Sequence, residues 1–193
     1  MKINIPLCLD IYSQIFNGLS EDQINGFKEI LSNINSDNHI TNPQWVAYML
    51  ATTWHETAFT MKPIDEYGST SYFEKRYGYQ TAVGKNLGNT KPGDGSRYHG
   101  RGYVQLTGKY NYNRVGRELG LDLINHPDSV KEPLIAYNIM AGGMIQGWFT
   151  GQSLSDYINS SKCDYINARR IINGTDKAKT IASYAKKFEA PLF

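Results

Sequence analysis

Residues 42–56 read NPQWVAYMLATTWHE and carry the signals of a complete helix. Either Thr41 or Asn42 can cap the first turn, and Pro43 suits the first helical position because its missing N–H would be unpaired there anyway. Apolar side chains then recur at spacings of three and four residues as far as position 54. The stretch therefore predicts a buried helix that closes on the pair His55-Glu56.

Helical signals also dominate the rest of the chain. Ser20 and Gln23 form a capping box, and apolar residues then recur at helical spacing over 21–34. Helical sequence resumes after Thr107 and in the stretches 133–149, 164–172 and 176–189. We therefore expect a mainly α fold with a small β or irregular insert.

The insert corresponds to residues 59–101, where Gly, Ser, Asn and Tyr dominate and helical periodicity is lost. The turn cluster 91–95, KPGDG, lies within it. A loop region of this length is uncommon in a compact domain unless it is functional, so we expect it to line a cleft. Short strands are the regular structure we expect there.

Length and composition favour one globular domain over residues 1–193, with a helical N-terminal segment over 1–40. The net charge of +2 does not argue for nucleic acid, and the basic stretch 161–190 is interpreted as a solvated helix face. Cys8 and Cys163 offer neither a disulfide framework nor metal-ligand spacing. Without a signal peptide or a long apolar run, we expect synthesis in the cytoplasm and no stable membrane insertion.

Glu56 is the first candidate for acid–base chemistry. On a helix it aligns with Trp45, Met49 and Thr52, so its carboxyl would emerge beside apolar surface. Desolvation favours the protonated form that a general acid needs. A polar pair that merely ends the helix is an equally good interpretation of His55-Glu56. The stretch after it lacks the second histidine of a zinc protease.

The second carboxylate stands about ten residues on, at Asp65 or Glu66. A glycosidase that inverts configuration holds its acid and base about 6.5 to 9.5 Å apart. A continuous helix would separate residues 56 and 66 by about 15 Å of rise, so the chain must fold back at Pro63. Either acid could serve as the base on these grounds.

The segment 98–112, YHGRGYVQLTGKYNY, carries the remaining polar candidates. Gly100 and Gly102 do not start a dinucleotide motif, because Gln105 and the sequence beyond it do not fit one. Thr107 suits an N-cap for the next helix, and its hydroxyl could also hold a water. Nine aromatic residues between positions 67 and 112 suit sugar binding, where rings cover the apolar faces of pyranoses.

Taken together, five stretches resemble the family 19 chitinases, and more closely the short phage endolysins of that superfamily. They are ATTWHET (51–57), KPIDE (62–66), GNTKPGDG (88–95), the segment 98–112 and ING (172–174). The resemblance covers roughly residues 40 to 190. It implies a lysozyme-like helical fold with a cleft between two lobes, and glycosidic hydrolysis with inversion and no metal or other cofactor.

The resemblance also assigns roles to matching residues. Glu56 matches the general acid, Glu66 the general base, and Thr107 the hydroxyl that positions the attacking water. Substrate contacts are implied for Gln105, Tyr110, Asn111 and Asn173. Asp65 stays a minor candidate for the base.

Departures from the plant members favour the bacterial-wall branch of the superfamily. Gly108 stands where plant enzymes carry Trp or His, their bracing cysteines are absent, and Thr180 lies near the place of their C-terminal arginine. We therefore expect a monomeric endolysin, without a wall-binding domain, that cuts peptidoglycan after the membrane is permeabilised. The alternatives are a chitinase, a lytic transglycosylase, which retention of Glu66 disfavours, and a non-catalytic glycan-binding module.

Overall fold

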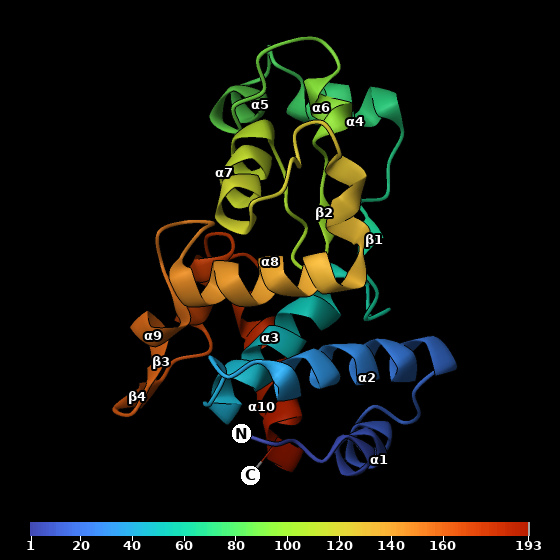
Figure 1. The fold of residues 1–193 in the computed structure, drawn as a ribbon, viewed down its shortest axis with the longest axis vertical. Coiled ribbons are helices and arrows are strands. Elements are labelled where there is room, and N and C mark those ends of the chain that lie inside the picture. The colour runs from blue at the N-terminus through green and yellow to red at the C-terminus, as the bar shows by residue number, and fades with distance from the viewer. Residues whose placement is uncertain (193) are drawn as a thin grey trace. The chain divides into compact units, whose positions relative to one another are not determined.

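The computed structural model describes residues 1–192 and forms two compact units. The first unit contains residues 1–62 and the chain from residue 140 onward, and the second contains residues 63–139. Residues 1 and 192 both lie in the first unit, whose course along the chain can be followed in Figure 1. Helices account for most of the regular structure, as the sequence predicted.

The first unit is helical apart from one short hairpin. Its hairpin pairs β3 (Ile158–Asn159) with β4 (Lys162–Cys163) in antiparallel register. Its helices are α1 (Ile5–Ile15), α2 (Glu21–Ser36), α3 (Pro43–Glu56), the end of α8 (Pro133–Gln146), α9 (Leu154–Tyr157), the 3-10 helix η2 (Asn167–Ile171), α10 (Ala178–Glu189) and the 3-10 helix η3 (Ala190–Leu192).

Helix α3 is the central element of the first unit. The side chain of Asn42 accepts a hydrogen bond from the Gln44 amide at 2.8 Å, and Pro43 takes the first helical position. Residues 46–54 are all buried, because α10 packs along α3 (Figure 1) and aromatic side chains close its other faces. The predicted helix is confirmed, and its burial fixes the position from which Glu56 projects.

Aromatic rings form the core beneath α3. The ring of Phe27 lies 5.3 Å from Tyr12, 5.9 Å from Trp54 and 5.6 Å from Phe188, measured between centroids. The Tyr12 hydroxyl donates to the Phe188 carbonyl at 2.9 Å, which satisfies this buried polar group. Helices α1, α2, α3 and α10 are thereby joined into one packed body.

The second unit holds another two-stranded sheet and several helices. It contains β1 (Ile64–Asp65), α4 (Thr70–Tyr77), α5 (Ala82–Asn86), α6 (Asp94–Arg97), β2 (Arg101–Gly102), α7 (Lys109–Leu119), the 3-10 helix η1 (Pro127–Lys131) and the start of α8. Strand β1 pairs antiparallel with β2, so that Ile64 faces Gly102 and Asp65 faces Arg101. This pairing brings the residues after Pro63 alongside the segment that begins at Tyr98.

The structure differs from the sequence prediction over residues 59–101. Helices α4, α5 and α6 lie where we expected loops and strands. With eight, five and four residues, they are too short to show a helical period. The side chains of Ser69 and Thr81 cap α4 and α5, and these caps were the available signal.

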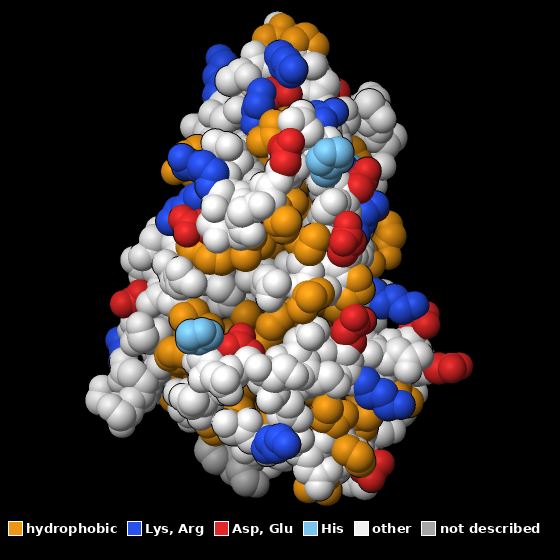
Figure 2. All heavy atoms as spheres, viewed as in Figure 1, with side chains coloured by type: hydrophobic (Ala, Val, Ile, Leu, Met, Phe, Trp, Pro, Cys, Tyr) orange, Lys and Arg blue, Asp and Glu red, His pale blue; other side chains and the backbone are white. Residues whose placement is uncertain are grey.

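The surface carries both signs of charge. On the face drawn in Figure 2, Lys and Arg side chains are interspersed with Asp and Glu in both units. Over the described residues, no helix combines the length and apolar character that a membrane span requires.

Candidate active site

Glu56 projects from the C-terminal end of α3 and is bound by an arginine. Its Oε1 accepts a hydrogen bond from Arg169 Nη1 at 2.6 Å. The side chains are 16% and 4% exposed respectively, so little water screens the pair. Glu56 and Arg169 therefore form a largely buried ion pair, a contact that the sequence of α3 alone did not predict.

Arg169 is a partner of Glu56 that sequence reasoning missed. It belongs to η2, between the buried residues Ala168 and Ile171, and its Nε donates to the Asp176 carbonyl at 3.0 Å. The signal available in the sequence was an arginine among the apolar residues of this stretch, because a charged side chain that becomes buried requires a partner. Thr180, near the expected place of the plant arginine, lies on α10. Arg169, which binds Glu56, lies eleven residues before Thr180 in the chain.

His55, beside Glu56, is a neutral neighbour rather than a second cation. Burial lowers its pKa below the ordinary value, and Arg169 and Lys177 act in the same direction. Glu56 and Asp176 oppose this shift without cancelling it. At neutral pH the imidazole is therefore uncharged and leaves Arg169 as the cation in contact with Glu56.

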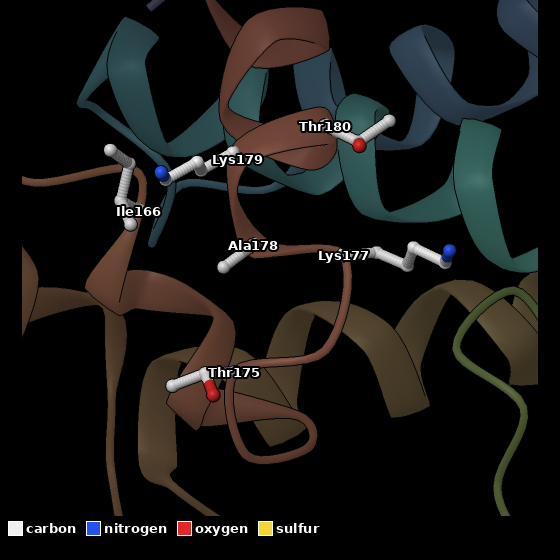
Figure 3. A pocket seen from close by; sticks show the side chains of 6 residues that line it. All are labelled: Ile166, Thr175, Lys177, Ala178, Lys179 and Thr180. Atoms are coloured by element: carbon white, nitrogen blue, oxygen red, sulfur yellow. The ribbon is translucent and has the colours of Figure 1, made fainter.

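Asn173 follows η2 in an exposed loop. Its backbone N–H donates to the Arg169 carbonyl at 3.0 Å, and the next residue, Gly174, takes a left-handed conformation with φ of 39°. A pocket of about 350 Å³ opens farther along this loop, where the Lys177 and Lys179 side chains point to opposite sides (Figure 3). The pocket is lined by Ile166, Thr175, Lys177, Ala178, Lys179 and Thr180.

In the second unit, Glu66 is held by neutral donors only. Its backbone N–H donates to the Gly100 carbonyl at 2.7 Å, directly after the β1–β2 pairing. The Tyr77 hydroxyl donates to Oε1 at 3.0 Å, and the Gly100 N–H donates to Oε2 at 3.3 Å. Burial raises the pKa of Tyr77 well above its ordinary value, so this phenol remains a donor.

Asp65 lies in a different environment. Its carboxylate is bound by Lys131 at 2.7 Å and by His99 and Arg101 at 3.1 Å each. Burial works against ionisation, but the hydrogen bonds from Lys131 and His99 outweigh it and lower the pKa of Asp65. Arg101, 5% exposed, also binds Tyr112 and anchors β2. Asp65 is therefore held by cationic partners, whereas Glu66 accepts hydrogen bonds from the neutral donors Tyr77 and Gly100.

Three of the sequence candidates meet around Gly100. A Cβ on this glycine would lie 3.2 Å from Glu66 Oε2, 3.2 Å from Thr107 Oγ1 and 2.8 Å from Gln105 Oε1. The carboxylate, the hydroxyl and the amide oxygen therefore surround one point. Only glycine leaves that point unobstructed.

Thr107 does not cap the following helix, and that prediction was wrong. Gly108 is the N-cap of α7 and has no side chain with which to cap it. A larger residue would not fit there, because a Cβ on Gly108 would lie 2.6 Å from the Cβ of Leu87. The Thr107 hydroxyl donates instead to the Gln105 carbonyl at 2.8 Å. Its oxygen lone pairs are therefore available as acceptors beside Glu66.

The other candidates of this unit support or flank the cluster. Gln105 takes a left-handed conformation, with φ of 53°, and its amide donates to the Ile64 and Gly102 carbonyls at 3.2 Å each. The Asn111 amide donates to the Thr107 carbonyl at 2.8 Å. Tyr110 is 57% exposed at the start of α7. The structure thus gathers Glu66, Gln105, Thr107 and Asn111 in one unit, and Glu56, Arg169 and Asn173 in the other.

Comparison of the chain with known proteins shows the family to which it belongs. The fold is similar to that of chitinase C from Streptomyces griseus HUT6037, with a TM-score of 0.68 and 19% identity over 95% of this chain and 91% of that one. Chitinase 11 of Oryza sativa subsp. japonica is 36% identical over 117 residues, which cover 47% of this chain and 44% of that protein.

An endochitinase of Persea americana is 33% identical over 116 residues, 58% of this chain and 34% of that protein. The chain therefore spans less than half the length of these two relatives. The family model for glycoside hydrolase family 19, described as chitinase class I, matches residues 22–173. Because that match covers well over half of the chain, the protein belongs to glycoside hydrolase family 19.

Proposed function

We propose that this protein hydrolyses the β-1,4 glycosidic bonds of bacterial peptidoglycan with inversion of configuration. Glu56 acts as the general acid, and Glu66 acts as the general base on a water that Thr107 helps to hold. Gln105, Tyr110, Asn111 and Asn173 contact the glycan. The observation that carries the proposal is the convergence of Glu66 Oε2 and Thr107 Oγ1 on one point beside Gly100.

The base half of the reaction follows from that convergence. A water held between Glu66 Oε2 and Thr107 Oγ1 donates one hydrogen to each, because the hydrogen of the Thr107 hydroxyl is committed to the Gln105 carbonyl. Both water hydrogens are then held by protein, and an oxygen lone pair faces the sugar carbon. As the bond to carbon forms, Glu66 takes the proton, and the Tyr77 and Gly100 donors keep its carboxyl in place.

The acid half is assigned to Glu56. In its protonated form it gives its proton to the leaving oxygen while the bond from that oxygen to the sugar carbon breaks. Glu56 becomes a carboxylate in that step, and Arg169 at 2.6 Å stabilises the negative charge as it develops. An arginine fixed in advance by the Asp176 carbonyl needs no rearrangement to do so.

Peptidoglycan is proposed as the substrate because the chain departs from the plant chitinases at the positions noted above. Gly108 leaves the start of α7 without a large side chain, and the chain has only two cysteines. We propose a monomeric endolysin of the phage type that reaches the wall after a separate membrane lesion. Chitin is the second candidate, favoured by the names of the relatives, which are chitinases.

The experiment that tests the proposal is digestion of purified peptidoglycan and of chitin oligomers, followed by reduction and mass spectrometry. Reduced muramic acid or glucosamine ends on peptidoglycan fragments are expected, because hydrolysis leaves a reducible sugar. Anhydro ends would indicate a lytic transglycosylase. Cleavage of chitin oligomers alone would contradict the proposed substrate, and cleavage of neither would contradict the proposed activity.

A further inference from the structure

Arg76 is a cation in the second unit that has no acidic partner. It is exposed on α4, and none of the ion pairs found among residues 1–192 includes it. The neighbouring acid on the same helix, Glu74, is turned to the Ser96 N–H, which it binds at 2.6 Å. Among the described residues, no carboxylate of its own unit therefore forms a direct ion pair with the guanidinium, and the charge of Glu66 acts on it only from farther away.

The guanidinium is nevertheless held in place by two tyrosines. Its Nη1 donates to the Tyr72 hydroxyl. Its central carbon lies 5.8 Å from the centroid of the Tyr72 ring and 5.2 Å from that of the Tyr77 ring. Cation–π contacts orient an arginine without using its N–H donors, so most of the five donors stay available. A fixed, largely unused guanidinium fork is suited to bind a carboxylate.

This cation stands next to the proposed base. Tyr77, whose ring contacts Arg76, donates its hydroxyl to Glu66 Oε1 at 3.0 Å. Tyr67 follows Glu66 and is 74% exposed, and Tyr72 is 39% exposed. Exposed tyrosine rings offer apolar faces to sugars. One tyrosine side chain therefore separates the free guanidinium from the carboxyl that would activate water.

We propose that Arg76 and Tyr72 form a subsite, beside Glu66, for a carboxylate carried by the glycan. The inference rests on the proposed function and deepens it, since it names the group by which an anionic wall polymer is distinguished from neutral chitin. The carboxylate belongs either to the lactyl group of muramic acid or to the peptide stem attached there. The Arg76 fork donates to both carboxylate oxygens, and the Tyr72 ring lies against the sugar.

The test compares initial rates on three substrates. Intact peptidoglycan carries stem carboxylates, glycan strands stripped of their stems by an amidase carry lactyl carboxylates, and chitin oligomers carry none. Arg76→Met is expected to raise KM about tenfold on the substrate that bears the recognised carboxylate and to leave chitin oligomers unaffected. Arg76→Lys should restore part of the loss, because it keeps the charge without the fork.

Lys75→Met is the matched control, since Lys75 is the adjacent exposed cation on α4 and should leave all three rates unchanged. An equal loss by Arg76→Met on all three substrates would overturn the inference, because Arg76 would then act only by positioning Tyr77. No loss on any substrate would overturn it as well.

A binding arm separates failure of the subsite from failure of the proposed function. Glu56→Gln and Glu56→Gln/Arg76→Met are titrated with stripped strands and with intact peptidoglycan fragments by calorimetry. Weaker binding of either ligand by the double variant supports the subsite even where hydrolysis is absent. Equal binding of both ligands by the two variants overturns it even where hydrolysis is present.

Discussion

Replacement of Glu56 by glutamine is expected to lower kcat on peptidoglycan by about 10²–10⁴-fold, because an amide has no acidic proton to give to the leaving oxygen. KM should change little, since the glutamine side chain has nearly the same shape. The measurement is the rate of release of reducing ends under saturating substrate. Loss of kcat with an unchanged KM would mark an interaction made in the transition state rather than in substrate binding.

A substrate with a better leaving group provides the control. A nitrophenolate departs without protonation, so a nitrophenyl glycoside of the same sugars should lose far less rate in Glu56→Gln. The glutamine oxygen can still accept a hydrogen bond from Arg169, but the arginine loses its ionic partner. Thermal unfolding must therefore show that the variant is folded at the assay temperature. Equal losses on both substrates would rule out Glu56 as the acid.

The paired variants Glu66→Gln and Asp65→Asn are expected to separate catalysis from stability. Glu66→Gln should lower kcat by about 10²–10⁴-fold, because an amide does not accept the proton of the attacking water. Asp65→Asn should keep kcat within about threefold, because that carboxylate is occupied by Lys131, His99 and Arg101. Azide, a nucleophile that needs no base, should restore turnover to Glu66→Gln. The reverse ranking of the two variants would assign the base to Asp65.

Asp65→Asn is instead expected to change the pH dependence of stability. Since the pKa of Asp65 is lowered in the folded state, its ion pairs stabilise the protein above the ordinary value of 3.8 and are lost as pH falls through the folded-state pKa. The side chain is 41% exposed, so the contribution is about 1 kcal/mol after allowance for solvent screening. In urea unfolding, Asp65→Asn should have a free energy of unfolding lower than that of the wild type by about this amount at pH 7, and the difference should be smaller near pH 3.

The long helices were predictable because each has both a period and a cap. Helices α2 and α3 begin at the predicted caps, Ser20 and Asn42, and α3 ends at Glu56 as expected. The helices of residues 70–97 were not predicted, because elements of four to eight residues carry too few apolar positions to establish a period. Their Ser and Thr caps look the same as ordinary turn residues in a polar sequence.

The resemblance names the candidate residues of the site, but their contacts were not predictable from the sequence. Gln105 and Thr107 lie beside Glu66, because β1 pairs with β2. The Arg169–Glu56 ion pair joins residues 113 positions apart, and no local pattern encodes it. The contrast between Asp65 and Glu66 likewise arises from tertiary contacts, since the two residues are adjacent in sequence. Tertiary contacts, rather than spacing in the sequence, decide which of the two neighbouring acids is held in ion pairs.

Proton NMR of the first reducing ends released from a β-linked glycan tests the central claim most directly. In the proposed mechanism a water held by Glu66 and Thr107 attacks the face opposite the leaving group, so the new anomeric centre should appear first in the α form. The β signal should then grow only at the rate of spontaneous mutarotation. A β anomer that appears first would contradict the account, because it requires retention through a covalent intermediate or an equivalent double displacement.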